Sequence, residues 1–93
     1  MDRKDKLTEA MNACPIYGIT GGTRDVIPLV KGMLSAGIRI IQYREKGKTP
    51  ILRYQEAMIL RRLTYDYHAL LIIDDYVDLA LAVHADGVHI GQA

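Results

Sequence analysis

Four short apolar runs, separated by longer segments of helical periodicity, constrain what this sequence of 93 residues can fold into. The apolar runs are residues 16–20, 38–46, 69–73 and 88–90. The segments between them, where apolar side chains recur three or four positions apart as in an amphipathic helix, are residues 24–36, 49–67 and 77–84. Strands that alternate with helices through short loops pair in parallel by right-handed crossovers. The sequence therefore predicts an α/β fold in the order β-α-β-α-β-α-β.

The number of predicted strands fits half of a known architecture. A complete (β/α)₈ TIM barrel has eight parallel strands and about 250 residues, whereas four strands and three intervening helices are predicted here. We therefore interpret residues 1–93 as one partial domain, the N-terminal half of a TIM barrel. A short leading helix is expected over 1–12, and the four strands lie within 14–93. Chemistry in such folds gathers at the carboxyl ends of the strands.

Capping signals and apolar spacing predict where the helices begin, end and pack. Thr23 is a candidate N-cap for the first helix, Gly37 is a natural stop, and Thr49 followed by Pro50 marks the start of the second. The continuous apolar run 69–73 suggests a strand buried on both faces. The predicted apolar helix faces comprise Val26, Ile27, Val30, Met33 and Leu34, then Ile51, Leu52, Tyr54, Met58, Ile59 and Leu63, then Val77, Ala80, Leu81 and His84.

Composition excludes several classes of function. A net charge of +1 gives no bulk electrostatic attraction for nucleic acid or an acidic membrane surface. No apolar run approaches the roughly 18 residues of a transmembrane helix. The N-terminus, residues 1–7, is charged and lacks the apolar core of a secretory signal. Cys14 is the single cysteine and cannot form an intramolecular disulfide, which favours a reducing, cytoplasmic setting.

The run 38–46 carries the strongest candidate site. Side chains of a strand alternate between faces, so Gln42, Arg44 and Lys46 share a face if the strand continues to its end. An amide, a guanidinium and an ammonium at the end of a buried strand form a set of hydrogen-bond donors suited to an anion. The structural alternative is a solvated strand end whose cations pair with Glu45 or Asp75.

Other candidates have simpler structural interpretations. Asp75 suits a helix cap, although one carboxylate can cap and bind metal through different oxygens. His84 and His89 have no partner at metal-ligand spacing and are interpreted as structural, and Cys14 has no identifiable base nearby. The pair Gly21-Gly22 could approach a phosphate, but two glycines alone are a weak signal. The remaining aromatic candidates, interpreted as packing residues, are Tyr54, Tyr65 and Tyr67.

Three segments in order together resemble the thiamine-phosphate synthase family, over about residues 14–93. They are 40–46 (IIQYREK), 71–80 (LIIDDYVDLA) and 85–92 (ADGVHIGQ). The family consists of (β/α)₈ barrel enzymes. They join hydroxymethylpyrimidine diphosphate to a thiazole phosphate, giving thiamine phosphate and pyrophosphate. The resemblance implies the same fold and reaction, small-molecule substrates and Mg²⁺ as cofactor.

The resemblance also implies roles for individual residues. The residues that would hold the pyrimidine diphosphate are Gln42, Tyr43, Arg44, Glu45, Lys46 and Asp74. Arg44 and Lys46 would act as catalytic residues that stabilise the departing diphosphate electrostatically. Asp75 matches a magnesium ligand, and the second magnesium carboxylate of the family follows directly after Ala93. Asp74 stands where the family usually has asparagine, and an ionised carboxylate accepts hydrogen bonds but donates none.

Several hypotheses follow. The first is a synthase fragment that is inactive by itself. The second is a thiazole tautomerase-like protein, since that family shares the fold and the segment 44–46 but generally lacks a segment like 85–92. The third is a non-catalytic half-barrel that self-associates as a homo-oligomer, because its first and fourth strands would be unpaired edges. A module that binds diphosphate without reaction is a further possibility.

Overall fold

The computed structural model describes residues 17–22 and 25–90. The leading helix expected over 1–12, Cys14, the Thr23 cap and the Gly91-Gln92 pair lie outside the described residues. The elements are β1 (Tyr17–Ile19), α2 (Val26–Ser35), β2 (Ile40–Tyr43), α3 (Pro50–Asp66), β3 (Leu70–Asp74), α4 (Val77–Ala82) and β4 (Gly87–His89). The predicted order of strands and helices is confirmed.

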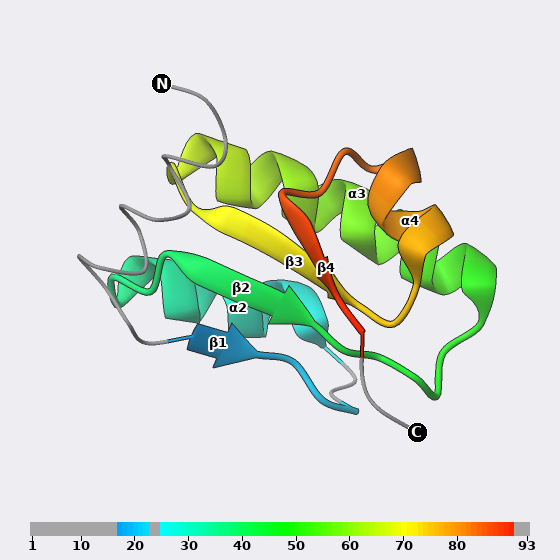
Figure 1. The fold of residues 1–93 in the computed structure, drawn as a ribbon. Coiled ribbons are helices and arrows are strands. Elements are labelled where there is room, and N and C mark those ends of the chain that lie inside the picture. The colour runs from blue at the N-terminus through cyan, green and yellow to red at the C-terminus, as the bar shows by residue number, and fades with distance from the viewer. Residues whose placement is uncertain (1–16, 23–24, 91–93) are drawn as a thin grey trace.

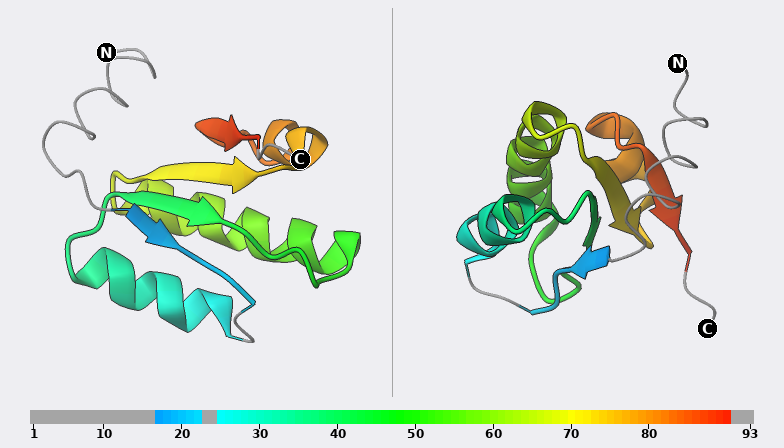
Figure 2. Two further views of the ribbon diagram at one scale, coloured as in Figure 1. Left: turned by 60° about the horizontal axis from the view of Figure 1, so that its bottom comes forward. Right: turned by 90° about the vertical axis from the view of Figure 1, so that its left-hand side faces the viewer.

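The four strands form one parallel sheet in the order β1-β2-β3-β4. In the part of the chain that the structure describes, the three helices cover one face of this sheet and no helix covers the opposite face (Figures 1 and 2). Each helix connects two adjacent parallel strands, as expected for successive βα units. In the described residues β1 and β4 are the edges of the sheet. All carboxyl ends of the strands therefore lie on the same side of the half-barrel, where the candidate site was predicted.

Two of the predicted helix boundaries are confirmed, the start of α3 by a hydrogen bond and the end of α2 by the backbone conformation of Gly37. The Thr49 hydroxyl accepts a hydrogen bond from the backbone N–H of Leu52 at 3.3 Å, and Pro50 is the first residue of α3. Gly37 follows α2 with a φ of 100°, a left-handed conformation that glycine adopts without steric cost. At the start of α2 the N-cap position is occupied by Asp25, whose side chain makes no capping hydrogen bond.

The predicted apolar faces of α3 and α4 are wrong for most of their residues, and only Leu63 and Ala80 of them pack in or against the core. The buried residues of α3 are Ala57, Leu60 and Thr64, whereas Ile51 is 69% exposed. In α4 the buried side chains are Leu79 and Ala80, whereas Leu81 is exposed. The predicted packing residues Tyr54, Tyr65 and Tyr67 are also exposed, and so are Leu52, Met58, Ile59, Val77 and His84. The inward face of α3 is instead occupied by Ala57, Leu60 and Thr64, beside polar side chains that pair with the neighbouring elements. Only for α2, with Val26, Val30 and Leu34 buried, does the predicted apolar stripe match the core.

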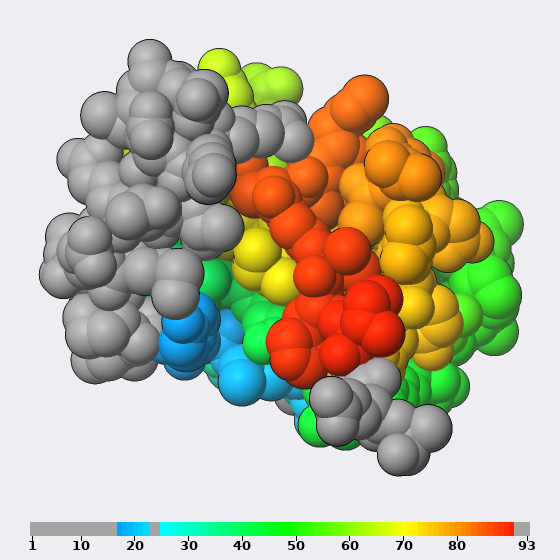
Figure 3. All heavy atoms as spheres, in the orientation of Figure 1, coloured from blue at the N-terminus to red at the C-terminus, as the bar shows by residue number. Residues whose placement is uncertain are grey.

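The central strands β2 and β3 are buried on both faces, as predicted for residues 69–73. Ile41, Tyr43, Leu71 and Ile73 point toward the helices and are almost fully buried in the main hydrophobic cluster, and Ile40 and Leu70 on the opposite face are each 1% exposed. A Cβ at Gly18 would lie 2.5 Å from the Met33 Sδ, so a larger residue there would require the Met33 side chain to shift. On the edge strands, the side chains of Tyr17, Ile19 and Val88 are exposed, and the space-filling view shows β4 at the surface (Figure 3).

None of the helices described here is long and apolar enough to cross a bilayer.

The central strand is shorter than predicted. It spans Ile40–Tyr43 instead of residues 38–46. At its start, the Ile38 N–H bonds to the Met33 carbonyl at 3.1 Å and so belongs to the end of α2. At its end, the Arg44 N–H donates to the Thr20 hydroxyl at 2.8 Å and not to a neighbouring strand. Strand alternation therefore applies only as far as Tyr43, and the positions of Arg44 and Lys46 are set by a loop.

Candidate active site

Six polar side chains meet at the carboxyl ends of β2, β3 and β4. We call them the rim cluster, and they are Gln42, Arg44, Lys46, Asp74, Asp75 and His89. Gln42 lies on the face of β2 opposite that of Tyr43, Asp74 is the last residue of β3, and His89 is the register partner of Asp74 on β4. The amide, the guanidinium and the ammonium lie together at this end of the sheet as predicted, but only Lys46 pairs with Asp75, whereas Gln42 and Arg44 contact Asp74.

Asp74 contacts three other members of the rim cluster. Its side chain is only 5% exposed and receives donors from two other strands. The amide of Gln42 donates to Oδ1 at 2.9 Å, and Nδ1 of His89 lies 2.8 Å from the same oxygen. The Nε of Arg44 lies 3.3 Å from Oδ2. An ionised carboxylate only accepts hydrogen bonds, so this contact suits the form of His89 that carries a proton on Nδ1.

Asp75 and Lys46 form the second pair of the rim cluster. Lys46 Nζ lies 2.9 Å from Asp75 Oδ2, and both side chains are accessible to solvent. Asp75 has a φ of 67°, a left-handed conformation that aspartate tolerates better than most residues. Its N–H donates to the His89 carbonyl at 2.7 Å, which fastens the end of β4 to the end of β3. The N-cap position of α4 is occupied by Tyr76.

A groove of about 390 Å³ opens beside the two cations. Arg44 and Lys46 line it together with Gly21, Gly22 and Gly47. Gly22 has a φ of 66°, and neither Gly21 nor Gly22 has another atom within 4 Å of where a Cβ would lie. Two loops, after β1 and after β2, thus present bare backbone and two positive side chains to the same space. This combination suits a phosphate-bearing ligand.

Two of the predicted substrate contacts are not on the rim. Tyr43 and Glu45 are each about 1% exposed and lie beneath α3, on the other side of the chain from the groove. The Tyr43 hydroxyl donates to Glu56 Oε1 at 2.6 Å, and Glu45 Oε1 lies 3.2 Å from the ammonium of Lys48. The prediction of direct contact for these two residues is corrected, because their side chains point into the core. Gln42, Arg44, Lys46 and Asp74 remain predicted site residues.

Lys48 lies between two carboxylates at the base of the loop that carries Arg44 and Lys46. Its ammonium donates to both oxygens of Glu56, at 2.9 and 2.8 Å. No donor in the described residues approaches either Glu45 oxygen with hydrogen-bond geometry, so Glu45 depends on the charge of Lys48. Burial lowers the pKa of Lys48, but the hydrogen bonds to Glu56 and the nearby carboxylate of Glu45 outweigh it and raise the pKa overall. Burial, with the Glu56 hydrogen bond second, raises the pKa of the Tyr43 phenol far above its ordinary value.

These two shifts predict a loss of stability in alkaline solution. Tyr43 and Lys48 have ordinary pKa values of 10.0 and 10.5, which describe the unfolded chain, and both values are raised by folding. The folded state therefore holds protons that the unfolded state has released, so the stability is complete below about pH 10 and falls as the pH rises further. Urea denaturation at about pH 8, 10 and 11 should show this fall, with a smaller slope for Tyr43→Phe. The exposed Tyr65→Phe is the control, and equal slopes in both variants would contradict the prediction.

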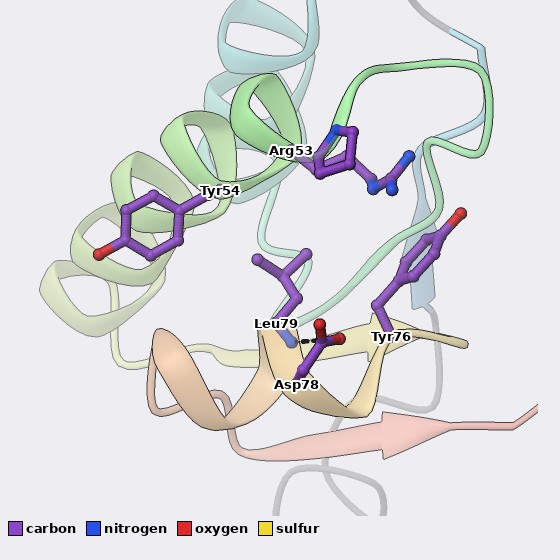
Figure 4. A pocket seen from close by; sticks show the side chains of 6 residues that line it. Arg53, Tyr54, Tyr76, Asp78 and Leu79 are labelled. Atoms are coloured by element: carbon purple, nitrogen blue, oxygen red, sulfur yellow. Dashed lines mark hydrogen bonds between the residues drawn. The ribbon is translucent and has the colours of Figure 1, made fainter.

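Arg53 anchors the same loop from α3. Its Nη1 donates to the Lys48 carbonyl, and its guanidinium lies 4.1 Å from the centre of the Tyr76 ring. Figure 4 shows these two side chains next to each other at a pocket between α3 and α4, which Asp78 and Leu79 also line. The volume of the pocket is about 240 Å³. The Asp78 carboxylate in this pocket accepts from its neighbour Leu79. The contacts of Arg53 thus hold the loop that carries Arg44 and Lys46 against α3. The pocket is lined by charges of both signs.

The donor set fits magnesium only in part. The described residues contain no group of three or more His, Cys, Asp or Glu side chains that could hold a metal. However, Mg²⁺ commonly keeps several waters and takes one or two carboxylates together with substrate phosphates. Asp75, which is partly exposed beside the groove, suits this mode, whereas the oxygens of Asp74 are committed to Gln42, His89 and Arg44.

His89 and Thr20 are rim residues that sequence reasoning missed. His89 was interpreted as structural because no partner lies at metal-ligand spacing in the sequence, but the register of β3 and β4 places it opposite Asp74. Thr20 is fully buried, and its hydroxyl fixes the backbone of Arg44. Their positions could have indicated a role, since Thr20 follows β1 and His89 ends β4, and polar groups gather at the carboxyl ends of the strands in such folds.

Comparisons with known proteins agree on one family. The family model described as thiamine monophosphate synthase matches residues 6–93. Thiamine-phosphate synthase of Dictyoglomus thermophilum is 62% identical over 79 residues, covering 85% of this chain and 34% of that protein. The corresponding protein of Caldicellulosiruptor bescii is 47% identical over 96 residues, covering 99% of this chain and 43% of that protein.

A solved structure supports the fold. Thiamine phosphate pyrophosphorylase from Pyrococcus furiosus superposes with a TM-score of 0.74 at 41% identity, covering 77% of this chain and 36% of that one. The predicted half of a TIM barrel is thereby confirmed, and this chain spans about a third to two fifths of the length of these relatives. From its sequence motifs, its parallel sheet and these matches, the chain belongs to the thiamine monophosphate synthase family.

Proposed function

We propose that this chain supplies the pyrimidine-diphosphate side of a thiamine-phosphate synthase active site. The observation that carries the proposal is the groove beside Gly21 and Gly22, into which Arg44 and Lys46 bring two positive charges next to Asp75. The whole reaction condenses hydroxymethylpyrimidine diphosphate with thiazole phosphate and releases pyrophosphate. The match of the chain to enzymes of that name supports this assignment.

The residues of the rim suit departure of a diphosphate. Negative charge grows on the leaving oxygens as the bond to the pyrimidine methylene breaks, and fixed positive groups lower the energy of that state. Arg44 offers planar guanidinium donors and Lys46 a compact charge. Asp75 would hold Mg²⁺, which when bound would neutralise further phosphate charge. Because Lys46 pairs with Asp75 in this structure, its ammonium must exchange that partner for phosphate when the ligand enters.

We further propose that this chain by itself turns over no substrate. It would act in the cytoplasm, with its sheet extended by further strands. The exposed edges β1 and β4 would otherwise remain unpaired, with Ile19 and Val88 exposed beside them. Unpaired edges favour association, either with further strands or with a second copy as a homo-oligomer.

Light scattering of the purified chain tests whether two copies associate, and a monodisperse monomer would contradict this association. Formation of thiamine phosphate by the purified chain would contradict the proposed inactivity.

The direct test is calorimetric titration of the protein with pyrophosphate in the presence of Mg²⁺. We expect Arg44→Ala to weaken pyrophosphate binding by about tenfold or more, because it removes a charge-assisted contact. Arg62→Ala is the matched control, since Arg62 is 82% exposed on α3 and pairs only locally with Asp66. Binding that is absent in the unsubstituted protein, or equal in the two variants, would overturn the proposed site.

A further inference from the structure

Asp74 has a part in this site that its position alone does not reveal. It was predicted to contact substrate, but its side chain is 5% exposed and its oxygens face Gln42, Arg44 and His89. We propose that Asp74 is a positioning residue that orients the Arg44 guanidinium for a diphosphate ligand. The inference rests on the proposed function, because it assigns how the same groove is prepared for its anion.

The geometry at Arg44 supports this role. Asp74 Oδ2 lies 3.3 Å from Nε, the donor closest to the backbone, while the Arg44 side chain is 55% exposed. Of the five N–H donors of an arginine, four belong to the two Nη atoms at the tip. The ion pair at Nε therefore holds the base of the guanidinium and leaves the donors at its tip for the ligand. The backbone of Arg44 is fixed as well, through the Thr20 hydroxyl.

The charge balance makes Arg44 and Asp74 interdependent. A carboxylate removed from water beside an anion site opposes anion binding unless cations or donors offset it. Asp74 Oδ1 contacts the side chains of Gln42 and His89, whereas Oδ2 faces the permanent positive charge of Arg44. Asp74 therefore aids diphosphate binding when Arg44 is present and opposes it when Arg44 is absent.

Asparagine is the informative substitution because it has the same shape. In Asp74→Asn an oxygen can still accept from Gln42 and His89 at the Oδ1 position. The other atom becomes an NH₂ group, a donor that would face the Nε donor of Arg44. The substitution thus removes the pair with Arg44 while preserving the packing of a buried side chain.

The test is a double-mutant cycle on pyrophosphate binding with Mg²⁺, using the unsubstituted protein, Asp74→Asn, Arg44→Ala and the double variant. We expect Asp74→Asn to weaken binding by about fivefold when Arg44 is present, and to cause no loss, or a gain, in the Arg44→Ala background. A mere loss of folding would weaken both backgrounds alike. Asp74→Asn effects of the same sign and size in both backgrounds overturn the proposal.

A measurement without ligand separates this inference from the proposed function. In nuclear magnetic resonance, the Arg44 Nε–H should exchange with water more slowly than the Nε–H of Arg62, whose partner Asp66 is exposed. Asp74→Asn should abolish the difference. If the protein binds no pyrophosphate, the proposed function fails, yet slow exchange at Arg44 still supports the positioning contact. Equal exchange at the two arginines in the unsubstituted protein overturns the inference whether or not any variant folds.

Discussion

Replacement of Lys48 by methionine is expected to lower the free energy of unfolding by about 3 kcal/mol. The ammonium lies within 3.2 Å of both Glu45 and Glu56, and its side chain is mostly buried. Removing it leaves the carboxylates of Glu45, beneath α3, and of Glu56, on α3, without this counter-charge, and a buried charge that loses its partner costs several kcal/mol. Methionine retains the aliphatic stem, so lost packing contributes little. Urea denaturation monitored by circular dichroism measures the change.

A lysine on the surface provides the control for this prediction. Lys31 is exposed on α2, and Lys31→Met should change the free energy of unfolding by no more than about 0.5 kcal/mol. Adding Glu45→Gln to Lys48→Met should recover part of the loss, because it removes one of the stranded charges. A Lys48→Met variant as stable as Lys31→Met would show that the two glutamates do not depend on Lys48.

Asp86→Ala should destabilise the protein by a similar amount, about 3 kcal/mol. Asp86 Oδ2 accepts from the Leu71 N–H at 2.8 Å and from Arg61 Nη1 at 2.9 Å, and its own N–H donates to the Leu71 carbonyl. One carboxylate thus joins the loop before β4, the start of β3 and the helix α3. Its removal leaves a mostly buried guanidinium without its carboxylate and a backbone N–H without its acceptor.

The comparison variant for this prediction is Asp66→Ala. Asp66 is half exposed and pairs with Arg62 within the same helix, an interaction worth only a few tenths of a kcal/mol. The two substitutions remove the same side chain, so the difference between their unfolding free energies reports the burial of the Arg61–Asp86 pair. A difference below about 1 kcal/mol would contradict the structural role assigned to Asp86.

The sequence by itself determined the order of elements, the parallel sheet and several boundaries. These features depend on local chemistry, which neighbouring residues carry in full. Thr49 with Pro50 starts a helix by its own hydroxyl and ring, and Gly37 ends one by its freedom of φ. The gathering of Gln42, Arg44, Lys46 and Asp75 was predictable too, because parallel strands bring their carboxyl ends to one side.

Only the tertiary structure decided which way the side chains point. On α3 most of the large apolar residues are exposed, whereas Ala57, Leu60 and Thr64 are buried, and the ion pairs Arg61–Asp86 and Lys48–Glu56 lie along the inner side of the helix. Tyr43 and Glu45 were predicted to be site residues, yet both lie in the core. His89 and Asp74 are 15 positions apart and meet through strand register. Such pairings depend on contacts between distant segments, whose free energies no local pattern contains.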